Sequence, residues 1–109
     1  MAPLLLVVTT VADRDEAHRM ARALVGRGLA ACAQISAIES VYAWRGAVEE
    51  GPEFRILFKV APAAYDAAEQ AIRALHSYEL PAIHAIPVER AWAPYREWVE
   101  ANSRAGADL

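Results

Sequence analysis

The segment LHSYELPAI, residues 75–83, places three side chains that can do chemistry within four positions: His76, Tyr78 and Glu79. An imidazole and a carboxylate are ligands that Cu²⁺ accepts, and together with a phenol they can also hold a small polar molecule in a cleft. The same residues can instead satisfy the free backbone groups at a helix end, with Pro81 fixing the turn. Both interpretations of the segment stay open on the sequence.

Cys32 is the only cysteine of the chain. A thiolate suits Cu⁺, and a cysteine paired with a histidine can act as a nucleophile. Because Cys32 follows two alanines in a strand-like run, it is also typical of a small buried hydrophobic residue. We therefore name His76 and Cys32 as the candidate metal ligands, and expect Cys32 to be buried if it is structural.

Aromatic residues gather in two parts of the chain. Tyr42, Trp44 and Lys59, with Tyr78 and Glu79, are candidates for the wall of a binding pocket, and Lys59 is expected to pair with Glu79 or Glu49. The second group contains Trp92, Tyr95 and Trp98. It is more typical of a core or a subunit interface, where Trp and Tyr are enriched.

Two further histidines have weaker interpretations. His18 lies among polar residues of a predicted helix and is expected on its solvated face. His84 alternates with apolar neighbours on a predicted strand, and the sequence suggests for it only a partly covered edge position.

The elements that must position these residues follow from hydrophobic periodicity and from breakers. A helix capped by Asp13 buries Ala17, Met20, Ala21, Leu24 and Val25 and ends at Gly26 and Gly28. A second helix follows Pro62, and a short one begins at Pro94, ahead of a frayed tail. Strands are predicted over 4–10, 31–44, 54–60 and 82–91. We expect a bulge near residues 36–37, a turn at 45–46, a break at 51–52 and an edge or bulge at Pro87.

The order of elements is β-α-β-β-α-β with a long central β-hairpin and a short C-terminal helix. This order predicts an α+β, ferredoxin-like fold in a single domain over residues 1–109, with both long helices on one face of an antiparallel sheet. The other face is then left open, and a small domain usually covers such a face with a partner.

Length, charge and missing motifs exclude several classes. The chain has 109 residues and a net charge of −3 without blocks of like charge, which argues against nucleic acid or an anionic membrane as a partner. No apolar run reaches the roughly 20 residues that span a bilayer. A lone cysteine fits a reducing, cytoplasmic compartment. There is no phosphate loop, HExxH or CxxC motif, so we predict a protein that is not an enzyme.

Five strings in order along nearly the whole chain resemble the CutA family of divalent-cation-tolerance proteins: VVTTVADRDEA, ALVGRGLAACAQI, SVYAWRGAVEE, LHSYELPAIHAIPV and YREWVEANS. The resemblance implies a ferredoxin-like homotrimer in the cytoplasm, similar in architecture to the PII signalling proteins. It implies a link to copper and other divalent metals and no family-wide reaction.

The chain departs from the family pattern at several positions. Ser77 replaces a proline, Ala82 an acidic residue and Gln34 an asparagine. Family members credited with copper ligation have metal-binding side chains where this chain has Thr9 and Leu75, so His76 alone is left of that set.

Three functions remain open on the sequence. The leading one is a homotrimer that binds Cu²⁺ weakly and responds to metal ions. The alternative is a PII-like protein that binds a small anionic effector between subunits. The third is an enzyme that uses Cys32 or His76.

Overall fold

The central feature of the fold is a four-stranded sheet, in which alternating apolar side chains place one buried face toward the helices. The computed structural model describes residues 2–106. Its strands are β1 (Leu4–Val11), β2 (Cys32–Trp44), β3 (Ala47–Val60) and β4 (Ile83–Val88); its helices are α1 (Arg14–Gly26), α2 (Tyr65–Leu75) and α3 (Ala93–Asn102), with a 3₁₀ turn at Pro62–Ala64. The strands pair antiparallel in the order β2-β3-β1-β4. The predicted ferredoxin-like α+β fold is confirmed.

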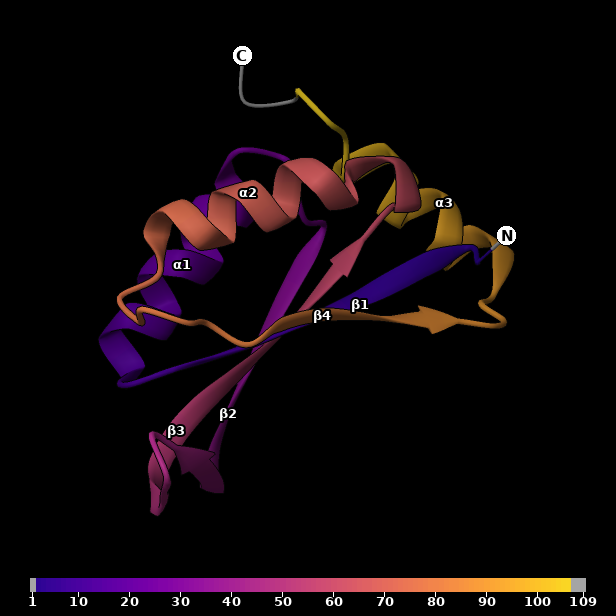
Figure 1. Ribbon diagram of the computed structural model, residues 1–109. Helices are drawn as coiled ribbons and strands as arrows, with labels where there is room; N and C mark the ends of the chain where they lie inside the picture. The colour runs from indigo at the N-terminus through magenta and orange to yellow at the C-terminus, as the bar shows by residue number, and fades with distance from the viewer. Residues whose placement is uncertain (1, 107–109) are drawn as a thin grey trace.

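The helices α1 and α2 lie side by side on one face of the sheet, while the β2–β3 hairpin extends away from it (Figure 1). The strand residues of this face and the apolar sides of the two helices form the main core. Its largest fully buried side chains include Phe58, Ile56, Met20, Leu24 and Ile72. Burial of this apolar surface is the main force that holds the helices against the sheet.

Helix α1 begins as the sequence predicts. The Asp13 side chain accepts a hydrogen bond of 2.8 Å from the backbone N–H of Glu16, which is the geometry of an N-cap. The predicted apolar stripe is buried except for Val25, which is 41% exposed. The prediction for Val25 was wrong because this residue lies in the last turn of α1, one residue before the helix ends at Gly26.

The hairpin is longer and more regular than predicted. The pairing of β2 with β3 runs without interruption from Cys32↔Lys59 to Trp44↔Ala47, so the expected bulge and the expected break are both absent from this pair. Pro52 is tolerated because β1 pairs with β3 only from Phe54 onward, which leaves Pro52 at an open edge on that side. A proline without an N–H is acceptable where no neighbouring strand needs the bond.

Strand β4 is an edge strand, as Pro87 predicted, but it is shorter than the expected 82–91. The last β4 pair is Leu4↔Val88 because β1 itself begins at Leu4. Beyond this point the chain has no strand to pair with, and Glu89 and Arg90 are exposed.

Helix α3 packs against the end of the second sheet face. Val99 is fully buried with Leu4 and Ala31, and Leu6, Val88 and Tyr95 pack around them. The expectation of an open second face was therefore wrong in part: α3 covers one end of it. The exposed apolar side chains lie mainly on the hairpin, β4 and α3.

The residue after α3 is also ordered, in contrast to the predicted frayed tail. The Ser103 hydroxyl donates to the Leu29 carbonyl at 2.7 Å and accepts from the Ala61 N–H at 2.8 Å, and Ser103 is 2% exposed. Because both backbone groups would otherwise be buried without partners, Ser103 fixes the end of α3 to the body of the fold. Residues 107–109 of the predicted tail lie outside the described residues.

Candidate functional site: an acidic aromatic pocket

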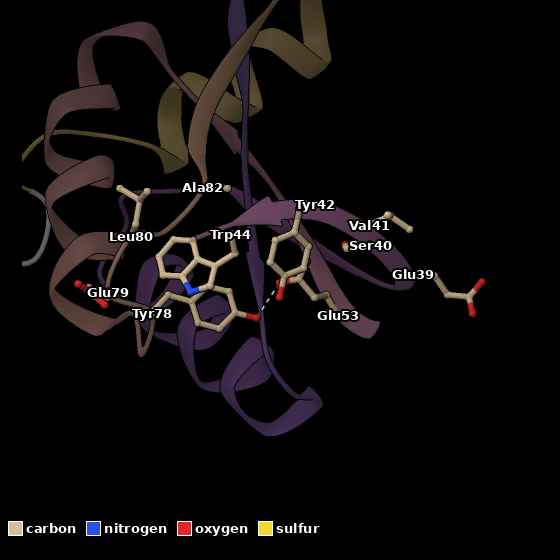
Figure 2. A pocket seen from close by; sticks show the side chains of 10 residues that line it. All are labelled: Glu39, Ser40, Val41, Tyr42, Trp44, Glu53, Tyr78, Glu79, Leu80 and Ala82. Carbon is tan, nitrogen blue, oxygen red and sulfur yellow. Dashed lines mark hydrogen bonds between the residues drawn. The ribbon is translucent and has the colours of Figure 1, made fainter. Parts of the chain in front are cut away.

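A pocket of about 710 Å³ lies between the hairpin and the segment that joins α2 to β4 (Figure 2). Its lining residues are Glu39, Ser40, Val41, Tyr42, Trp44, Glu53, Tyr78, Glu79, Leu80 and Ala82. Most of this lining is contributed by two segments that are distant in sequence, so the pocket depends on the tertiary fold.

The hairpin forms one side of the pocket because β2 and β3 extend beyond the other two strands of the sheet. Arg45 and Gly46 have φ values of 50° and 81°, which is the type I′ geometry of a two-residue hairpin loop. Tyr42 and Trp44 lie two positions apart on β2, and so share one face of the hairpin. Glu53 pairs with Ile38 and therefore lies on that same face.

His76 fixes the segment 76–82, which forms the side of the pocket facing the hairpin. Its side chain is fully buried, and Nε2 lies 2.9 Å from the Thr10 carbonyl oxygen and 3.1 Å from the Thr9 hydroxyl. Because a carbonyl only accepts, Nε2 carries the proton, and Nδ1 is free to accept the Tyr78 N–H at 3.1 Å. The ring thus ties the start of the 76–82 segment to β1 and orients Tyr78.

A buried carboxylate supports the same turn. Glu16, at the start of α1, accepts the Ser77 N–H at 2.9 Å and the Ser77 hydroxyl at 2.8 Å. Its side chain is 8% exposed, and an oxygen lies 3.9 Å from His76 Nδ1. The serine that replaces the family's proline therefore supplies both donors, whereas a proline has no N–H to donate.

Tyr78 projects into the pocket and is held there by Glu53. The Tyr78 hydroxyl donates to Glu53 Oε2 at 2.6 Å, the bond drawn in Figure 2. Burial raises the pKa of Tyr78 strongly above its usual value of 10.0, and the hydrogen bond to the Glu53 carboxylate raises it further. Tyr78 is therefore a neutral hydrogen-bond donor throughout the physiological range.

This pKa shift predicts a loss of stability in alkali. Because the folded protein holds the Tyr78 proton above pH 10 while the unfolded chain releases it, Tyr78 contributes stability below pH 10 that is lost as the pH rises through its folded pKa. We expect the midpoint of urea unfolding to fall more steeply above pH 10 in the native protein than in a Tyr78→Phe variant. Equal pH slopes for the two proteins would contradict the shift.

The pocket is acidic. Glu39, Glu53 and Glu79 line it, and among residues 2–106 no lysine, arginine or histidine does. The nearest cation in the described contacts is Arg45, whose Nη2 lies 2.9 Å from Glu79 Oε2 in an exposed ion pair. The same guanidinium lies over the Trp44 ring, 5.2 Å from its centroid.

The structure brings together four of the five residues that we named as ligand-binding candidates: Tyr42, Trp44, Tyr78 and Glu79. Lys59 lies elsewhere. Its Nζ is 3.2 Å from the Tyr95 hydroxyl and 5.6 Å from the centre of that ring, so the expected pairing with Glu79 or Glu49 was wrong. In the strand register, Lys59 of β3 stands opposite Cys32 of β2 and Leu6 of β1, near the end of the sheet that α3 covers.

The two candidate metal ligands are separated. His76 bonds to Thr9 on the helix-covered face, whereas Cys32 shares the other face with Lys59 and Leu6. Cys32 is half-buried rather than buried as expected, because it is the first residue of the outer strand β2. Within residues 2–106, no group of three or more His, Cys, Asp or Glu side chains is placed to hold a metal ion.

His18 is exposed on α1, as predicted. His84 is also exposed, although a partly covered position was expected, because it lies on the edge strand β4. Trp92 and Trp98 are 77% and 46% exposed, which excludes the core for them within one chain.

Sequence reasoning missed Glu16, Glu39 and Glu53. Only Glu16 carried a usable signal, since it stands three residues after the cap Asp13, at the position where a glutamate supports a helix start. Nothing near Glu53 in the sequence indicated a contact with Tyr78, which lies 25 residues further along.

None of the helices in residues 2–106 has both the length and the apolar character that crossing a membrane requires.

The fold and the site define a ferredoxin-like α+β protein with a binding pocket beside an extended hairpin. The sequence profile of the CutA1 divalent ion tolerance proteins matches residues 5–102. The chain belongs to this family.

Individual members of the family are similar to this chain over most of its length. The divalent-cation tolerance protein CutA of Archaeoglobus fulgidus is 33% identical over 94 residues, which are 86% of this chain and 92% of that protein. A chloroplastic CutA 1 of rice is 32% identical over 103 residues, and the chain spans 58% of its length. The crystal structure of CutA1 from Shewanella sp. SIB1 is similar with a TM-score of 0.89 at 39% identity, covering 94% of this chain and 96% of that one.

Proposed function

We propose that this protein acts in the tolerance of divalent cations as a cytoplasmic homotrimer that binds Cu²⁺ weakly. Membership of the CutA1 family supports the role in tolerance. The observation that carries the assembly is the apolar surface that a single chain leaves exposed on its extended hairpin. The half-buried, unpaired Cys32 is compatible with a reducing compartment, although the structurally similar A. fulgidus protein is described as periplasmic.

The hairpin carries the clearest argument for assembly. Val41 and Val48 near its tip are 69% and 76% exposed, and Ile86 on the edge strand β4 is 48% exposed. Apolar side chains on a long hairpin and on an unpaired edge are unfavourable in water and favour contact with another chain. A second copy is the natural partner because homo-oligomers with closed symmetry are the commonest assemblies.

Light scattering coupled to gel filtration tests the trimer. We expect a mass three times the 11.9 kDa of the chain at micromolar concentration. A Val48→Glu variant should shift the mass toward that of one chain, since a buried unpaired charge is costly. The control is Val25→Glu, which changes an exposed apolar residue of α1 away from the hairpin and should keep the native mass. A monomeric native protein would refute the assembly.

Weak copper binding fits the way in which the histidines are placed. His76 uses both ring nitrogens in hydrogen bonds, whereas His18 and His84 are exposed and free to meet an ion. Exposed single imidazoles bind Cu²⁺ without the support of a closed ligand set. His76 and Cys32 remain the ligands that the sequence names, and the placement of His76 favours its structural alternative.

Calorimetric titration with CuCl₂ separates these possibilities. We expect His76→Gln to leave the affinity within about twofold while lowering the melting temperature, because the change disturbs buried hydrogen bonds and no metal bond. The matched variant His84→Ala should weaken binding without changing the melting temperature. Loss of Cu²⁺ binding in a folded His76→Gln protein would restore His76 as the ligand.

The PII-like alternative, with a small anion in the cleft, is less well supported. That alternative places the anion between subunits, whereas the pocket described above lies within one chain. Within that pocket, Glu39, Glu53 and Glu79 would repel an anionic effector, and Arg45 is already paired with Glu79.

An enzymatic role has less support, because the residues considered for it, Cys32 and His76, lie on opposite faces of the sheet and cannot act as a pair within one chain. The family is named for tolerance and not for a reaction.

A further inference from the structure

The pocket beside the hairpin has a composition that the tolerance role does not explain. Aromatic rings come from Tyr42 and Trp44 on β2 and from Tyr78 on the 76–82 segment, and carboxylates stand at its margins. Figure 2 shows the three rings grouped together, with Glu53 beside the Tyr78 hydroxyl and Glu39 pointing away from the rings. Glu53 is therefore the carboxylate beside the rings, while Glu79, whose side chain is 74% exposed, makes an ion pair with Arg45 at the rim.

Aromatic faces and carboxylates attract the same kind of ligand. The faces of Trp and Tyr rings carry partial negative charge and bind ammonium groups, and a nearby carboxylate adds direct attraction. A neutral apolar ligand would gain nothing from the carboxylates. An anion would be repelled by them.

The protein's own Arg45 shows this chemistry at the rim of the pocket. Its guanidinium makes an ion pair with Glu79 at 2.9 Å and lies 5.2 Å from the centre of the Trp44 ring. Arg45 has a φ of 50°, which is unusual for a residue other than glycine, at a turn position that Asn, Asp or Gly prefers. One face of Trp44 thus already contacts a cation, and Arg45 is not among the lining residues of the cavity.

A bare metal ion fits the pocket less well. Hard cations need several oxygen ligands at about 2.0–2.6 Å, and they favour carboxylates and carbonyls over neutral hydroxyls. Besides its carboxylates, the lining offers the hydroxyls of Ser40, Tyr42 and Tyr78, and the Tyr78 hydroxyl is held by Glu53. One oxygen of Glu53 is taken by the Tyr78 hydroxyl, and Glu39 points away. The cavity of about 710 Å³ is instead within the range of sites that hold small organic molecules.

We propose that the pocket formed by Tyr42, Trp44, Tyr78, Glu53 and Glu79 binds a small organic ammonium ion, with the cationic head against the rings and the carboxylates. One chain supplies all the residues that line the pocket, so the proposal requires neither the trimer nor Cu²⁺ binding. Val41 both lines the pocket and belongs to the exposed surface that we propose a second chain contacts.

Titration with choline tests the proposal, followed by tryptophan fluorescence and by calorimetry. The neutral isostere 3,3-dimethyl-1-butanol has the same shape without the charge, and succinate is the anionic control. We expect saturable binding of choline, at least tenfold weaker binding of the isostere, and no response to succinate.

Variants locate the site. Trp44→Leu should weaken choline binding by about 2- to 30-fold, the range of a cation–π contact. Glu53→Gln keeps an acceptor for the Tyr78 hydroxyl while removing the charge, and should also weaken binding. The matched control Trp92→Leu changes an exposed tryptophan that does not line the pocket, and should bind as the native protein does.

Three results would overturn the proposal: no saturable choline binding, equal affinity for the neutral isostere, or native affinity in a folded Trp44→Leu protein. Circular dichroism establishes that each variant is folded. If light scattering shows a monomer and choline still binds, the trimer fails and this pocket stands.

Discussion

Replacing Phe58 by alanine is expected to lower the free energy of unfolding by about 3–5 kcal/mol, the range for truncating a fully buried phenylalanine. Phe58 is 0% exposed near the C-terminal end of β3 and is among the largest fully buried side chains. It lies between β1 and β2, where it pairs with Val7 and Ala33, on the face covered by α1 and α2. A cavity here cannot collapse easily because elements surround it on several sides.

Urea unfolding followed by circular dichroism measures this loss at one fixed chain concentration, since assembly makes stability concentration-dependent. The graded variant Phe58→Leu leaves a smaller cavity and should cost less. Arg19→Ala on the exposed side of α1 should change stability by no more than about 0.5 kcal/mol. A loss at Phe58→Ala as small as that of the Arg19 control would contradict the assignment of this core.

Replacing Glu16 by alanine is expected to cost about 2–4 kcal/mol. The change removes the acceptor of two short hydrogen bonds from Ser77 and leaves its N–H in a part-buried site without a partner. It also removes the carboxylate beside the buried His76 ring. Because this turn carries Tyr78, we also expect the Tyr78 side chain to be less firmly positioned in the wall of the pocket.

Asp15→Ala is the matched control, since Asp15 is an exposed acid in the same first turn of α1. It should cost only the few tenths of a kcal/mol of a charge at a helix N-terminus. A double-mutant cycle with Ser77→Ala should show a coupling of about 1–2 kcal/mol. Additive effects of Glu16→Ala and Ser77→Ala would show that the two side chains do not interact.

Local patterns predicted most of the fold. The helical spacing after Asp13 gave α1, and the alternation of Phe54, Ile56, Phe58 and Val60 gave the inner half of β3. These predictions succeeded because the periodicity of a buried face is set by the geometry of one element. The break at Gly51-Pro52 was wrong because proline disrupts a strand only where a neighbour needs its N–H.

The sequence indicated individual residues of the site but not how they contact one another. The structure places Tyr42, Trp44, Tyr78 and Glu79 around one pocket, and the sequence grouped them because aromatic and charged residues favour binding sites. That they bind a ligand stays a prediction. Lys59 was grouped with them wrongly, since sequence distance carries no information about which end of the sheet a strand residue occupies.

The amino-acid sequence alone determined the order of the elements, the long hairpin and the family, all of which depend on neighbours along the chain. Only the tertiary structure decided that His76 turns inward to β1, that Glu53 holds Tyr78, and that Cys32 lies on the opposite face of the sheet. The physical reason is that these contacts join residues 25 to 66 positions apart. Strand register and the close packing of helices on the sheet fix such contacts, and no local pattern encodes them.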